Sequence, residues 1–155
     1  MIFGIRDARP SDMVHLQDCD VKCFDYGWTN EEWAFAIESY SVKVAHFYGT
    51  PIGFAVFVVV NDEPRIVHLF KVGVKPPFRK RKAGRLLIHE ATTFARVQGL
   101  NEIEAVVPEM LCSPGEPQDI TGWLLKVGFL GTGVIRNYIQ NMGVKEDGYK
   151  FKLRF

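Results

Sequence analysis

The sequence has few cysteines, no long apolar run and no excess of charge of one sign. Its three cysteines are too few for a disulfide framework at this length, which favours a reducing compartment. No apolar stretch approaches the roughly 20 residues of a membrane-spanning helix, and the N-terminal residues lack the basic and apolar regions of a secretory signal. The sequence therefore predicts a cytoplasmic protein without a membrane partner.

The charges of the chain are nearly balanced. Nineteen Lys and Arg side chains face eighteen Asp and Glu side chains, a net charge of +1, so no global field draws the protein onto nucleic acid or anionic lipid. The 155 residues are 47% apolar and 24% charged, as in ordinary globular proteins. Without an internal repeat, linker or low-complexity segment, residues 1–155 are expected to form a single domain.

The first half of the chain predicts one short strand, two helices and three strands. After the apolar start, Ser11 stands where the N-cap of a helix is expected. A second helix is indicated by TNEEWAFAI, in which Thr29 and Glu32 have the spacing of a capping box. Residues 41–74 are rich in Val, Phe and Ile and contain two turn-like interruptions, which favours three antiparallel strands.

The second half begins with the strongest helical pattern in the chain. Apolar residues recur on one helical face from Ala83 to Ala95, and Gly99 is placed to end the helix. A strand at 101–110 follows, and a strand, helix, strand order requires a parallel, right-handed crossover. A loop at 112–119, a short helix at 120–129 and strands at 131–142 and 148–155 complete the chain. The prediction is an α/β fold with a mixed, mostly antiparallel sheet flanked by helices, in the order β-α-α-β-β-β-α-β-α-β-β.

The segment VKPPFRKRKAGRLL concentrates positive charge between a predicted strand and a predicted helix. Five cationic side chains occupy seven positions, namely Arg79, Lys80, Arg81, Lys82 and Arg85. Backbone N–H groups and the helix dipole also favour an anion at the start of a helix, so the segment suits a ligand with several phosphates. A solvated basic turn is the alternative. A nucleic-acid surface is not favoured, because aromatic residues do not interleave the cations.

The segment VGVKPPFRKRKAGRLLIHEA resembles the acetyl-CoA pyrophosphate loop of the GNAT superfamily of N-acetyltransferases, V-x-V-x-P-x-x-R-x-x-G-x-G-x-x-L-L. The predicted element order is also that of this family, and WLLKVGF is similar to its LYEKLGF. The resemblance implies acetyl-CoA as cosubstrate and no metal. The residues it places against acetyl-CoA are Val72, Val74, Arg79, Lys80, Arg81, Lys82, Ala83, Gly84 and Arg85.

Two positions depart from the family pattern. Lys82 replaces the first loop glycine, and a lysine avoids strain there only if its φ is negative. Leu124 replaces a tyrosine that can protonate the departing CoA thiolate. These departures keep open an alternative function, a catalytically impaired GNAT-fold domain that binds CoA or a protein partner.

Two residues are candidates for the base that deprotonates the amine. His68 lies eleven residues before Arg79, a position from which the family can project a base. Glu104 lies where the N-terminal acetyltransferase branch of the family carries its base. The alternatives are a core histidine on an apolar strand and a solvated carboxylate near a strand entrance.

The acceptor is predicted to be a primary amine, with peptide or protein N-termini favoured and small amines or lysine left open. CDVKCFDYGWTNEEWAF is similar to the first helices of the branch that acetylates N-termini of ribosomal proteins. This likeness, together with an aromatic cluster and a tyrosine in the last predicted hairpin, suggests four acceptor residues: Phe24, Tyr26, Trp28 and Tyr138. Core packing is the alternative for the cluster. The sequence leaves a homodimer open.

Overall fold

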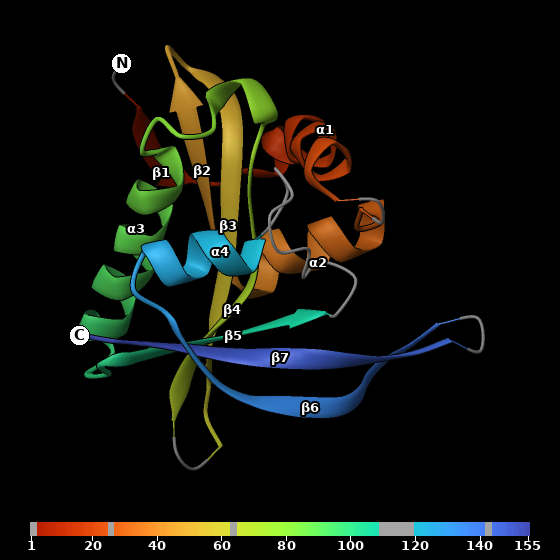
Figure 1. Ribbon diagram of the computed structural model, residues 1–155. Coiled ribbons are helices and arrows are strands. Elements are labelled where there is room, and N and C mark those ends of the chain that lie inside the picture. The colour runs from red at the N-terminus through yellow and green to blue at the C-terminus, as the bar shows by residue number, and fades with distance from the viewer. Residues whose placement is uncertain (1–2, 25–26, 63–64, 109–119, 142–143) are drawn as a thin grey trace.

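The computed structural model describes residues 3–24, 27–62, 65–108, 120–141 and 144–155, and at 108, 137–141 and 144–146 it describes the backbone alone (Figure 1). The strands are β1 (Gly4–Asp7), β2 (Ser41–Phe47), β3 (Thr50–Val60), β4 (Ile66–Val74), β5 (Glu102–Pro108), β6 (Leu130–Asn141) and β7 (Val144–Arg154). The helices are α1 (Met13–Cys23), α2 (Asn30–Ser39), α3 (Ala83–Val97) and α4 (Ile120–Lys126). These elements follow the predicted order, so the predicted fold class is confirmed.

The seven strands of the described residues form one sheet in the order β1-β2-β3-β4-β5-β7-β6. Of the strand pairs described, β4 and β5 are parallel and the others are antiparallel. The β4–β5 pairing covers only Val67 to Leu69 against Ile103 to Ala105. Beyond this contact β4 stays paired with β3 and β5 stays paired with β7, so the two strands separate. Figure 1 shows β5, β6 and β7 running steeply across the direction of β2, β3 and β4.

The core lies on both faces of the sheet, because alternate residues of β3 point to opposite faces. Phe54 and Val56 are buried with residues of α1 and α2, whereas Ala55 and Phe57 are buried with residues of α3 and α4. The helix α3 packs against the sheet through a stripe of buried apolar residues at intervals of four positions. The stripe consists of Ala83, Leu87, Ala91 and Ala95.

The helix ends agree with the sequence in two cases and disagree in one. The capping box of α2 is present, with the Glu32 N–H donating to Thr29 Oγ1 at 3.2 Å and the Thr29 N–H donating to Glu32 Oε1 at 3.1 Å. Gly99 follows the end of α3 with a φ of 75°, as a glycine there should. The predicted N-cap at Ser11 is wrong, because Ser11 lies within a 3-10 turn and α1 begins at Met13.

Asp12 explains the different start of α1. Its carboxylate accepts the Arg9 N–H at 2.7 Å and two hydrogen bonds from the Arg6 guanidinium at 2.7 and 2.8 Å. The carboxylate thus joins β1 to the turn that precedes α1.

Further differences concern the ends of elements in the second half. The helix α4 ends at Lys126, whereas the sequence predicts an end at 129. The strand β7 begins at Val144, whereas the sequence predicts a start at 148. The predicted loop at 112–119 lies outside the described residues. Within the described ranges, no helix has the length and apolar content needed to cross a membrane.

Asp12 should make the stability of the fold depend on pH. Hydrogen bonding from Arg6 is the main cause that lowers the pKa of Asp12 from 3.8 to about 2. A lowered pKa stabilises the fold above the unfolded value and loses that contribution as pH falls from about 4 to about 2. Urea unfolding should therefore show Asp12→Asn less stable than wild type by about 2 kcal/mol at pH 6, with the difference vanishing near pH 2. A difference that stays constant over this range would contradict the assignment.

Candidate active site

The separation of β4 and β5 leaves one edge of β4 without a strand partner among the described residues. The Lys75 N–H donates to the Ile52 carbonyl at 2.8 Å, so Val74 and Gly53 face each other as a non-hydrogen-bonded pair. The N–H and C=O of Val74 therefore point away from β3, as do those of Val72 two residues earlier. The N–H and C=O of Val72 and the N–H of Val74 can hydrogen bond to an extended molecule that carries amides, whereas the Val74 carbonyl already accepts Arg79 Nε.

The strand β4 is also irregular where it leaves β5. Val56 faces Lys71 and Phe57 faces Leu69, so Phe70 is an extra residue with no partner on β3. A bulge of this kind re-aims side chains and often lies beside an active site. Phe70 is 41% exposed, which is unusual for an aromatic residue in a central strand.

The segment between β4 and α3 is held at its first residues by α1. Arg79 Nε donates to the Val74 carbonyl at 2.8 Å, and Cys23 Sγ contacts the same oxygen at 3.4 Å. Lys75 Nζ lies 2.9 Å from Asp18. Because these contacts fix the path of the chain out of β4, the cationic loop has a defined position relative to the open edge.

The start of α3 has the features of an anion site. Lys82 is the N-cap residue and makes no side-chain capping hydrogen bond, so the first N–H groups of α3 have no cap to satisfy them. Lys82 has a φ of 72° and Lys80 a φ of 61°. The condition for an unstrained lysine at position 82 is therefore not met, because Lys82 takes the left-handed conformation that suits glycine, at a cost of about 1–2 kcal/mol.

Gly84 is needed for packing against α4. A Cβ at this position would lie 2.7 Å from Cζ2 of Trp123, so only glycine lets the indole approach the first turn of α3. Leu124, next to Trp123, is 1% exposed and belongs to the core. The position where the resemblance predicts a tyrosine in the family thus belongs to the core, and Trp123 is a neighbour of the loop that sequence reasoning missed.

The structure brings the two candidate bases together. His68 and Glu104 face each other across β4 and β5, and both are partly buried. Burial lowers the pKa of His68 below its usual value, and the charge of Glu104 acts in the opposite direction. Glu104 Oε2 also lies 3.9 Å from the ammonium groups of Lys150 and Lys152. The imidazole is therefore neutral near pH 7 and able to accept a proton.

The predicted acceptor residues are only partly described. The rings of Phe24 and Trp28 both lie 4.8 Å from Lys71 Nζ. Tyr26 lies outside the described residues, and for Tyr138 the backbone within β6 is described without the side chain. Of the four, Trp28 is the one that the structure places in a pocket.

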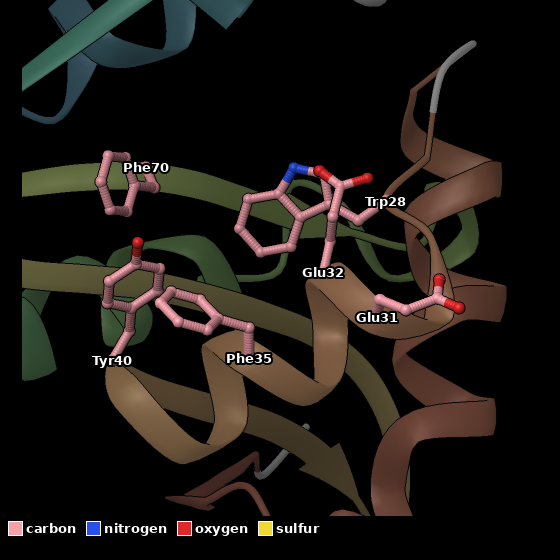
Figure 2. Close-up of a pocket in the computed structure, with 6 residues that line it drawn as sticks. All are labelled: Trp28, Glu31, Glu32, Phe35, Tyr40 and Phe70. Carbon is pink, nitrogen blue, oxygen red and sulfur yellow. The ribbon is translucent and has the colours of Figure 1, made fainter.

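The pocket has a volume of about 360 Å³ and lies between α2 and β4 (Figure 2). It is lined by Trp28, Glu31, Glu32, Phe35, Tyr40 and Phe70. A chain of ring contacts connects the candidate base with the pocket. The ring centroids lie 4.7 Å apart for His68 and Phe70, 5.1 Å for Phe70 and Tyr40, and 5.3 Å for Tyr40 and Phe35. The pocket thus begins one side chain away from His68.

A buried ion pair supports this region, and sequence reasoning missed it. Lys71 Nζ lies 2.6 Å from Asp20 Oδ1, and the side chains are 10% and 0% exposed. The contact is a charge pair without good hydrogen-bond geometry. Asp20 Oδ2 accepts the Trp28 N–H at 2.7 Å and the indole N–H of Trp33 at 3.1 Å. Asp20 therefore joins β4, α2 and the segment that carries Trp28. The one feature of the sequence that could have indicated this ion pair is a lysine within an otherwise apolar strand.

The described part of the chain contains no group of three or more His, Cys, Asp or Glu side chains that could hold a metal ion.

Comparison with known proteins gives one family and many similar folds. The model of the acetyltransferase (GNAT) family matches residues 7–109. Among solved structures, the ribosomal-protein-S18-alanine N-acetyltransferase of Escherichia coli aligns with a TM-score of 0.77 and 19% identity, over 99% of this chain and 94% of that one. A search of curated protein sequences found no significant match.

Two plant structures are similar to a comparable degree. Arabidopsis thaliana NAA60 in complex with a bisubstrate analogue aligns with a TM-score of 0.81 and 16% identity, over 99% of this chain and 98% of that one. Arabidopsis thaliana Naa50 in complex with the bisubstrate analogue CoA-Ac-MVNAL aligns with a TM-score of 0.77 and 21% identity, over the whole of both chains. At these identities the likeness shows a shared fold.

Substitutions of Lys71 and Asp20 should have coupled effects on the free energy of unfolding. Asp20→Asn leaves a buried ammonium unpaired and should reduce the free energy of unfolding by about 3–5 kcal/mol. Lys71→Met should cost less, because Asp20 keeps its two N–H donors. The double variant should be more stable than the sum of the single losses implies.

Urea unfolding of the two single variants and the double variant measures this coupling. Asp18→Asn is the matched control, since its carboxylate pairs with Lys22 and Lys75 at a side-chain exposure of 43% and should contribute at most about 1 kcal/mol. Additive losses for Asp20 and Lys71 would show that the pair has no coupled role.

Proposed function

Because the chain belongs to the acetyltransferase (GNAT) family, we propose that it transfers the acetyl group of acetyl-CoA to a primary amine, with a peptide or protein N-terminus as the favoured acceptor. The observation that carries the proposal is the separation of β4 and β5 after Leu69. It leaves the backbone of β4 open between two features that the reaction requires, a neutral imidazole and an uncapped helix start beside a cationic loop.

The phosphates of acetyl-CoA would bind at the start of α3. The N–H groups of its first turn supply partial positive charge, and the cationic side chains of the loop add to it. Arg79 can contact phosphate with its terminal nitrogens while Nε remains on the Val74 carbonyl. The amides of the pantetheine arm would pair with the N–H and C=O of Val72 and with the N–H of Val74, whose carbonyl already accepts Arg79 Nε. The thioester would then reach the bulge at Phe70.

The transfer itself needs a neutral amine and a base. The amine nitrogen attacks the thioester carbon, His68 accepts the proton that the nitrogen loses, and the C–S bond breaks to release CoA as a thiolate. Glu104, opposite His68, favours the protonated imidazole that results. Leu124 supplies no proton, but a thiol with a pKa near ~8.5 can leave as a thiolate.

The energetics of deprotonation support an α-amine as acceptor. At pH 7 an α-amine with a pKa near ~7.8 loses its proton at a cost of about 1 kcal/mol, whereas a lysine side chain near ~10.4 costs about 4.6 kcal/mol. An imidazole base suits the first case. The similar structures of a ribosomal-protein-S18-alanine N-acetyltransferase and of Naa50 with the bisubstrate analogue CoA-Ac-MVNAL agree with this choice.

The alternative is a domain that binds CoA without transferring its acetyl group. The buried Leu124 in place of the family tyrosine and the strained Lys82 favour it. Thiol release during incubation with acetyl-CoA and a panel of amines distinguishes the two functions, because the alternative predicts binding without release.

Replacement of His68 should test the base directly. His68→Ala should lower kcat by roughly a hundredfold or more, the usual scale for a positioned base, and leave CoA affinity near normal. The wild-type kcat/KM should rise with pH in two steps, one below about 6.5 from His68 and one near ~7.8 from an α-amine acceptor. The lower step should be absent in His68→Ala, because the base that must be neutral is gone.

Glu104→Gln is the companion variant. It should lower kcat less than His68→Ala and move the lower step to still lower pH, since the charge that raises the pKa of His68 is removed. Full activity in His68→Ala together with a large loss in Glu104→Gln would assign the base to β5 instead.

A further inference from the structure

The pocket between α2 and β4 combines aromatic walls with carboxylates. Figure 2 shows Phe35 directed toward Tyr40, with Phe70 opposite both, and Glu32 rising beside the indole of Trp28. Glu31 extends from the neighbouring position, away from the rings. Phe35 is 56% and Phe70 41% exposed, so both rings offer apolar surface to a ligand.

The two carboxylates that line the pocket, Glu31 and Glu32, are available to bind a cation. Glu32 Oε1 accepts the Thr29 N–H in the capping box, which leaves Oε2 for another donor. Within the described residues, neither Glu31 nor Glu32 forms an ion pair. Lys71, the nearby cation, is already paired with Asp20. Capping explains a hydrogen-bond acceptor at position 32, but it does not require a charge, since glutamine serves equally well.

A group that satisfies both parts of the pocket has an apolar stem and a cationic end. Lysine and arginine side chains have this form: their methylenes pack on aromatic rings, and their charged ends bind carboxylates or lie over ring faces. A purely apolar group would leave the carboxylates unused, and an acidic group would be repelled.

We propose that this pocket binds a lysine or arginine side chain next to the acceptor amine, so that the preferred acceptor is a peptide or protein N-terminus with a basic first or second residue. The inference rests on the proposed function. The contact of Phe70 with His68 supports it, because a side chain in the pocket then lies one ring away from the amine at the base.

The test is a set of peptides that differ only at the first two residues. Lysine or arginine is compared with leucine and glutamate at each position, and kcat/KM is measured by thiol release. The basic peptides should exceed the leucine peptides by about tenfold, and this preference should weaken as salt rises. Glutamate peptides should be the poorest acceptors.

Variants locate the preference in the pocket. Glu32→Gln keeps the capping hydrogen bond and removes the charge, so it should reduce the ratio of lysine to leucine peptides by about fivefold. Glu38→Gln, an exposed position of α2 that does not line the pocket, should leave the ratio unchanged. Phe35→Ala should lower kcat/KM for lysine and leucine peptides alike, because both lose the apolar wall.

Two results would overturn the inference: leucine peptides equal to or better than lysine peptides, or a ratio that Glu32→Gln leaves unchanged. If no peptide releases thiol, the proposed function is wrong. Equilibrium binding of the same peptides to the CoA-loaded protein then tests whether the pocket binds a basic side chain. Tighter binding of lysine peptides that is lost in Glu32→Gln would retain the inference, and equal binding of lysine and leucine peptides would reject it.

Discussion

The short pairing of β4 with β5 is the constraint on which the rest of the site depends. Three residues of each strand meet, and each strand then continues with its other neighbour. The separation leaves the far part of β4 without a strand partner on that edge, beside the bulge at Phe70, and places His68 and Glu104 one residue before the point where the strands part. A longer pairing would close the opening along β4.

The two sides of the opening are held by different interactions. On one side, Arg79, Cys23 and Asp18 fix the cationic loop to the end of β4 and to α1. On the other side, Asp20 forms an ion pair with Lys71 and accepts hydrogen bonds from N–H groups of Trp28 and Trp33. Because both sets include residues of α1, this helix connects the proposed phosphate end of the site with the proposed acceptor end.

Local patterns made the fold and the loop predictable, and long-range contacts made the rest unpredictable. The capping box at Thr29, the apolar stripe of α3 and Gly99 are signals within a few residues, and each was confirmed. The N-cap at Ser11 was wrong because Asp12, in the turn before α1, pairs with Arg6 of β1. Lys71 with Asp20 and Trp123 with Gly84 meet only after folding. The pocket between α2 and β4 also combines residues far apart in the sequence, so spacing in the sequence could not reveal these features.

The measurement that tests the central claim most directly is the thermal unfolding of the protein with and without acetyl-CoA. A ligand that binds the folded state alone should stabilise it by about 2.7 kcal/mol at a hundred times its dissociation constant, so the account predicts a clear rise in Tm. An unchanged Tm at millimolar acetyl-CoA would show that the opening between β4 and β5 does not bind this substrate and would contradict the account.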